Sequence, residues 1–134
     1  MKVLIVESDV VRAEHWAGLL RDQKWGVAHA ASAQDAIDLL DKDTFRIIVL
    51  NLDLACGQAL SVPVYAGYRQ PAARVVVVTA TGMFNDGSIF QVCSNACGFL
   101  SVQADPADLV ALVDHHGSRP LAEANLAQGS RAFY

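Results

Sequence analysis

Short runs of apolar residues alternate along the chain with segments in which apolar residues recur at helical spacing. Continuous apolar runs are typical of strands that are covered on both faces. They predict five strands, at residues 2–6, 27–30, 46–50, 74–78 and 98–102. The segments between them predict helices over 10–23, from Ser32 onward, from about Val62 onward, over 88–96, and from Asp105-Pro106 onward. Strict alternation predicts an α/β fold, a doubly wound parallel sheet with helices on both faces.

Polar residues at the helix starts support this division of the chain. Asp9 or Ser8 is the expected N-cap of the first helix, and Ser32 opens a segment that resembles a capping box. Pro63 inside a helix would cost about 3 kcal/mol. We therefore expect the third helix to start near Val62 and leave residues 55–61 as a loop.

Composition and charge narrow the class of protein. With 134 residues, 53% of them apolar and 18% charged, the chain is expected to form one globular domain. A formal net charge of −4 disfavours nucleic acid as the partner, and no apolar run reaches the ~20 residues that a membrane span needs. The apolar run at the start of the chain, MKVLIVESD, is too short for a signal peptide. The three cysteines are an odd number, which together with this start favours a reducing compartment. We therefore expect a cytoplasmic protein.

Polar residues follow three of the predicted strands. Glu7, Ser8 and Asp9 come after the first strand, Asn51 after the third, and Thr79 after the fourth. In a doubly wound sheet, the carboxyl ends of the strands meet at one crevice, where ligands usually bind. These side chains are therefore the candidate site.

The stretches IVESD, VLNLDLACG, VVVTA and GFLSVQADPADL occur in the order of the landmarks of response regulator receiver domains, the CheY-like superfamily. The chain resembles this family over residues 1–116 and continues as a C-terminal tail over 117–134. The resemblance implies a flavodoxin-like sheet of five strands in the order 2-1-3-4-5. It also implies a reaction, in which an aspartate after the third strand takes a phosphoryl group from a histidine kinase with the help of Mg²⁺.

The family's functional positions are carried over one by one. The acidic pair that helps to hold Mg²⁺ falls on Glu7 and Ser8, and the phosphoacceptor falls on Asn51. The remaining positions are the metal-binding backbone carbonyl on Asp53, the hydroxyl on Thr79, the lysine on Val102, the proline after it on Gln103 and the aromatic switch on Phe99.

Several of these residues depart from the family pattern. The carboxamide of Asn51 is a far poorer nucleophile than a carboxylate, and Ser8 and Val102 remove a carboxylate and a cation from the same pocket. We expect a degenerate pocket without aspartyl phosphorylation and without a cofactor. Only Glu7 and Asp53 remain as weak Mg²⁺ ligands, whereas Asp9 is better explained as a helix cap.

The favoured interpretation is an atypical, stand-alone receiver domain of two-component signalling that acts by protein–protein contact and is not an enzyme. The resemblance places the contact on the face of the fourth helix, fifth strand and fifth helix, to a partner or to a second copy. Phe99 lacks the hydroxyl that suits a tyrosine to water, so we expect it to stay buried. Phe84 and Phe90 belong either to this contact face or to the core.

Three alternatives remain open. The first is a receiver that is phosphorylated on Asp53 or Asp9. The second is a flavodoxin-like cofactor binder or enzyme, which VESDVVRAEH disfavours because it has no glycine for a phosphate loop. The third is a thiol sensor that uses Cys56 or the pair Cys93 and Cys97, which are four residues apart on the predicted fourth helix.

Overall fold

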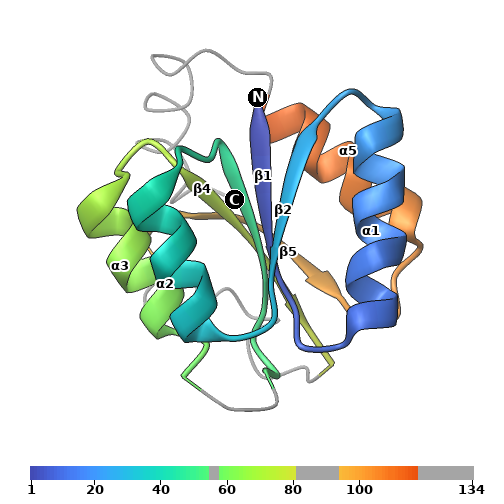
Figure 1. The fold of residues 1–134 in the computed structure, drawn as a ribbon. Coiled ribbons are helices and arrows are strands. Elements are labelled where there is room, and N and C mark those ends of the chain that lie inside the picture. The colour runs from blue at the N-terminus through green and yellow to red at the C-terminus, as the bar shows by residue number, and fades with distance from the viewer. Residues whose placement is uncertain (55–57, 81–93, 118–134) are drawn as a thin grey trace.

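The computed structural model describes residues 1–54, 58–80 and 94–117, and these form alternating strands and helices (Figure 1). The elements are β1 (Lys2–Val6), α1 (Val10–Asp22), β2 (Gly26–Ala30), α2 (Ala33–Lys42), β3 (Ile47–Asn51), α3 (Ser61–Arg69), β4 (Arg74–Thr79), β5 (Ala96–Ser101) and α5 (Pro106–Gly117).

All five strands pair in parallel in the order β2-β1-β3-β4-β5. Helices α2 and α3 cover one face of the sheet, and α1 and α5 cover the other (Figure 1). The predicted fold class and the strand order implied by the resemblance are therefore confirmed.

The sheet separates two hydrophobic cores because successive side chains of a strand point to opposite faces. In β1, Leu4 and Val6 join the core under α2 and α3, whereas Val3 and Ile5 join the core under α1 and α5. All four side chains are fully buried. This double coverage explains why the strands read as continuous apolar runs.

The predicted helix starts are confirmed by their hydrogen bonds. A carboxylate oxygen of Asp9 accepts from the backbone N–H of Arg12 at 3.2 Å, and the Ser32 hydroxyl accepts from Asp35 at 3.1 Å. Helix α3 begins at Ser61, so Pro63 lies in its first turn, where backbone N–H groups have no partner inside the helix.

The prediction for residues 94–97 is wrong. Strand β5 begins at Ala96, two residues earlier than expected, and Ser94 and Asn95 form a turn before it. Cys97 therefore lies in a strand and does not share a helix with Cys93 in the way we expected. Residues 88–93 of the predicted helix lie outside the described residues. The apolar residues of this short segment did not distinguish a helix end from a strand start.

The last turn of α5 closes against the loop between α1 and β2. The indole N–H of Trp25 donates to the Asp114 carboxylate at 2.7 Å, and a Cβ on Gly117 would lie 2.2 Å from the Trp25 ring. Only glycine fits at this position without a shift. The helix thus includes one residue of the segment 117–134 that we expected to be a tail; the rest of that segment lies outside the described residues.

Within the part of the chain that the structure describes, no helix has the length and apolar character that crossing a membrane requires.

Candidate functional site

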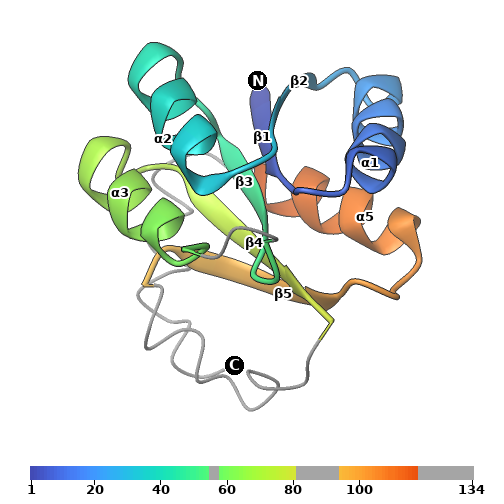
Figure 2. The same cartoon turned by 60° about the horizontal axis from the view of Figure 1, so that its bottom comes forward.

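The strand register brings the predicted polar residues together at the carboxyl edge of the sheet, which Figure 2 turns toward the viewer. Val6 of β1 pairs with Leu50 of β3, so Glu7 and Asn51 follow side by side. Asn51 in turn pairs with Val78 of β4, immediately before Thr79. Glu7, Asn51 and Thr79 are buried, with 1%, 3% and 2% of their surfaces exposed.

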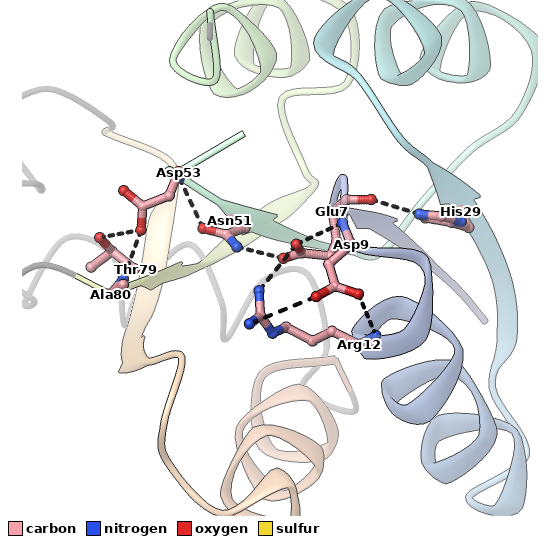
Figure 3. Close-up of polar contacts among 8 residues, drawn as sticks. All are labelled: Glu7, Asp9, Arg12, His29, Asn51, Asp53, Thr79 and Ala80. Carbon is pink, nitrogen blue, oxygen red and sulfur yellow. Dashed lines mark hydrogen bonds and ion pairs between the residues drawn. The ribbon is translucent and has the colours of Figure 1, made fainter. Parts of the chain in front are cut away.

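Asn51 lies between Glu7 and Asp53 and uses both ends of its amide (Figure 3). The amide nitrogen donates to Oε2 of Glu7 at 2.5 Å, and the amide oxygen accepts from the backbone N–H of Asp53 at 2.8 Å. A carboxylate at this position could accept the second bond but could not donate the first. The asparagine is therefore the residue type that this arrangement requires.

The buried carboxylate of Glu7 is balanced by Arg12. Its Oε1 accepts from the backbone N–H of Asp9 at 3.0 Å and from Nη1 of Arg12 at 3.3 Å. Arg12 also lies 4.0 Å from the Asp9 carboxylate, and 37% of its side chain is exposed. The opposite charge compensates the removal of Glu7 from water.

Sequence reasoning did not single out Arg12. Its spacing of three residues from Asp9, in the first turn of a predicted helix, was the available signal, because residues at that spacing are neighbours on a helix surface. The backbone carbonyl of Glu7 accepts from Nε2 of His29 on β2 at 2.7 Å, a contact that the sequence also did not indicate.

Asp53 directs its carboxylate to the end of β4 (Figure 3). Its Oδ2 accepts from the Thr79 hydroxyl at 3.1 Å and from the backbone N–H of Ala80 at 2.7 Å. Asp53 itself is exposed, although Thr79 is buried. The resemblance assigned to Asp53 only a backbone carbonyl, so this contact of its side chain was missed.

The residues present do not fit the Mg²⁺ ion that the resemblance implies. Mg²⁺ needs oxygen ligands that are free to complete an octahedron. Both carboxylate oxygens of Glu7 already accept hydrogen bonds, one of them from the cation Arg12, and the carboxylate of Asp53 faces Thr79. Across residues 1–54, 58–80 and 94–117, no group of three or more His, Cys, Asp or Glu side chains is placed to hold a metal ion.

The other candidate residues lie around this centre. Ser8 is half-buried, and Asp9 caps α1 as expected. Val102 packs against the α1–α5 core, and its backbone N–H donates to the Thr79 carbonyl at 3.0 Å. Phe99 is half-buried against the α2–α3 core. Phe84 and Phe90 lie outside the described residues, as do Cys56 and Cys93.

No family model and no curated protein sequence matches the chain. Solved structures do match. The response regulator receiver domain protein (CheY-like) from Methanospirillum hungatei JF-1 has a TM-score of 0.79 at 18% identity, over 92% of this chain and 95% of that one.

Two further structures extend the comparison. A Burkholderia pseudomallei response regulator protein with a phosphorylated aspartic acid, calcium ion and citrate has a TM-score of 0.74 at 21% identity, over 98% of this chain and 74% of that one. A Thermotoga maritima response regulator protein in complex with Mg²⁺ and BeF has a TM-score of 0.73 at 13% identity, over 85% of this chain and 96% of that one. The chain has the receiver-domain fold. Identities this low establish the fold alone.

Proposed function

We propose that this protein is an atypical receiver-like module of two-component signal transduction that acts through protein–protein contact without phosphoryl transfer. The fold is shared with a response regulator receiver domain protein and a response regulator protein at TM-scores of 0.79 and 0.74, which supports the assignment to signalling. We further propose that it is not an enzyme and works in the cytoplasm.

The position of Asn51 carries the proposal. It is the last residue of β3, where the resemblance puts the phosphoacceptor, and its amide is bonded to Glu7 at one end and to Asp53 at the other. An amide in this state is neither a nucleophile nor free to rotate toward a phosphodonor. The pairing of Glu7 with Arg12 adds a second obstacle, because the carboxylate that would help to hold Mg²⁺ is already neutralised.

A phosphodonor assay tests the absence of phosphoryl transfer. The protein is incubated with acetyl phosphate and MgCl₂ and its intact mass is measured, beside a phosphorylatable receiver domain as a positive control. We expect no phosphoryl adduct on this chain. An adduct mapped to Asp53 or Asp9 by peptide mass spectrometry would support the alternative in which phosphotransfer persists on another aspartate.

The partner contact is proposed to involve β5 and α5, as the resemblance implies. Leu100, Val110 and Leu112 of these elements are only partly buried. Ala111 is exposed on α5, so Ala111→Arg adds a large charged side chain to this face. Val64→Arg is the matched control, because Val64 is exposed on α3, which covers the opposite face of the sheet.

A two-hybrid screen against the histidine kinases and response regulators of the same organism, with this chain itself included, tests the contact. We expect at least one interaction that Ala111→Arg abolishes and Val64→Arg preserves. Both variants must give the circular dichroism spectrum of the wild type. Loss of the interaction in Val64→Arg alone would move the contact to α3, and the absence of any interaction would contradict the proposed function.

A further inference from the structure

We propose that the side chain of Asp53 is an intramolecular ligand, which occupies an oxyanion-binding pair of donors at the end of β4 and excludes external oxyanions from it. The donors are the hydroxyl of Thr79 and the backbone N–H of Ala80. The external ligand class is a tetrahedral oxyanion such as phosphate. The inference deepens the proposed function, on which its consequence for signalling rests.

The geometry of the donors is that of an anion site. Two donors from consecutive residues converge on one oxygen, Oδ2 of Asp53, at 3.1 Å from the hydroxyl and 2.7 Å from the amide nitrogen. The bond from the Ala80 amide has the short length that is typical of a hydrogen bond to an ionised oxygen, whereas the bond from the Thr79 hydroxyl is longer. An oxygen of phosphate offers the same charge and the same lone pairs, so it would be accepted by the same two donors.

The turn after β3 delivers Asp53 to these donors. The amide oxygen of Asn51 accepts from the backbone N–H of Asp53, two residues later, which is the hydrogen bond of an Asx-turn. The backbone N–H of Leu52 donates to the Val78 carbonyl at 2.8 Å and ties the same turn to β4. Asn51 is thus a positioning residue, because its side chain holds the backbone from which the Asp53 carboxylate reaches Thr79 (Figure 3).

Attachment to the same chain explains why the Asp53 carboxylate binds these donors in preference to an external oxyanion. Thr79 is 2% exposed, and the exposed Asp53 carries the carboxylate that is bonded to its hydroxyl. A group attached to the same chain acts at an effective concentration in about the millimolar range or above. An external oxyanion must displace it and also approach its negative charge. The contacts at the end of β4 are therefore the same whether or not a phosphate donor is present.

The test uses inorganic phosphate as the probe and the Ala80 amide resonance as the readout. The ¹H–¹⁵N spectra of the full chain are recorded at pH 7 during a titration with phosphate, with chloride at equal ionic strength as the reference. In the wild type, we expect the Ala80 resonance to follow the chloride reference. In Asp53→Ala, we expect a saturable shift of that resonance with phosphate. Before any phosphate is added, we also expect it to lie upfield of its wild-type position.

Two further variants make the result specific. Asp38→Ala removes one negative charge from an exposed position on α2 and should behave as the wild type. Adding Thr79→Val to Asp53→Ala removes the hydroxyl with little change of shape and should weaken phosphate binding about tenfold or more, equivalent to about 1.4 kcal/mol. Because Asp53 is exposed, we expect its replacement to leave the protein folded. The dispersion of the resonances in each spectrum reports whether a variant is folded.

Two outcomes would overturn the inference. If phosphate leaves the Ala80 resonance of Asp53→Ala unchanged, the two donors do not form an oxyanion site. If the wild type binds phosphate as well as Asp53→Ala does, the carboxylate does not occupy that site. Failure here is separable from failure of the proposed function, because phosphate binding is measured without a partner and the two-hybrid interactions are measured without added phosphate.

Discussion

Glu7 and Asp53 lie on either side of Asn51 and carry the same charge, but the fold treats them in opposite ways. Glu7 is buried, accepts a hydrogen bond from the amide nitrogen of Asn51 and forms an ion pair with Arg12. Asp53 is exposed and accepts from the Thr79 hydroxyl at the end of β4 and from the backbone N–H of Ala80, the next residue. A buried charge that loses compensation destabilises the fold, whereas an exposed charge can be removed at little cost. We therefore expect Glu7 and its partners to govern stability, and Asp53 to govern what binds the hydroxyl of Thr79 and the backbone N–H of Ala80.

We expect the greatest loss of stability from Asn51→Asp, which disrupts the hydrogen bond between residue 51 and Glu7. The substitution places a second carboxylate where the amide nitrogen now lies 2.5 Å from Glu7. Two like charges cost about 4 kcal/mol even at 4 Å with an effective dielectric constant of about 20. We expect urea unfolding at pH 7 to show a loss of about 3–5 kcal/mol.

The same variant also tests the coupling between the departures from the family pattern. Because Ser8 and Val102 are unchanged, we expect Asn51→Asp to show no normal phosphorylation with acetyl phosphate. Wild-type stability of this variant would mean that residue 51 and Glu7 are separated in solution. Phosphorylation at the rate of a typical receiver would contradict the prediction that Ser8 and Val102 also prevent the reaction.

A smaller effect is expected from Arg12→Ala. It leaves the Glu7 carboxylate bonded to Asn51 and Asp9 but without its cation, and the partial exposure of Arg12 lets water replace part of the lost contact. We expect a loss of about 1–2 kcal/mol in urea unfolding. Arg21→Ala, at an exposed arginine in the last turn of the same helix, is the control and should lose about 0.5 kcal/mol. Equal losses would show that Glu7 does not depend on Arg12.

Asp53→Asn tests whether the exposed carboxylate contributes to stability. It keeps the shape of the side chain and an oxygen acceptor for Thr79 and Ala80 but removes the charge. We expect a stability loss of about 0.5–1 kcal/mol, well below that of Asn51→Asp. A loss of about 3 kcal/mol or more would place Asp53 among the residues that hold the fold together and would remove the distinction between the two sides.

The smallest effect is expected from Mg²⁺. An ion that binds with a Kd ten times its concentration stabilises a protein by only about 0.06 kcal/mol, so millimolar Mg²⁺ should change the Tm of the wild type by well under 1 °C. Arg12→Ala is the informative comparison, because it removes the cation beside Oε1 of Glu7 and should therefore show a larger shift. A shift of several degrees in the wild type would indicate a metal site that Glu7 and its neighbours form despite Arg12.

Local patterns in the sequence determined the order of the elements and most of their ends. The apolar runs predicted the strands because strands covered on both faces bury every side chain, as Val3, Leu4 and Ile5 do. Asp9 and Ser32 predicted helix starts because a capping bond joins residues only three positions apart. Where two periodicities compete over a few residues, as before Ala96, the pattern was insufficient.

The meeting of Glu7, Asn51 and Thr79 could also be predicted from the sequence, since parallel strands bring their carboxyl ends to one edge of the sheet. The hydrogen-bond partner of each side chain, by contrast, depends on how the elements pack in three dimensions. Whether Asp53 turns toward Glu7 or toward Thr79 depends on a turn held by Asn51 and on the position of β4, and its Thr79 partner lies 26 residues along the chain. The ion pair of Arg12 with Glu7 likewise needs the first turn of α1 to fold back over the end of β1. Such contacts join segments whose relative direction is set by packing, and no local pattern contains that direction.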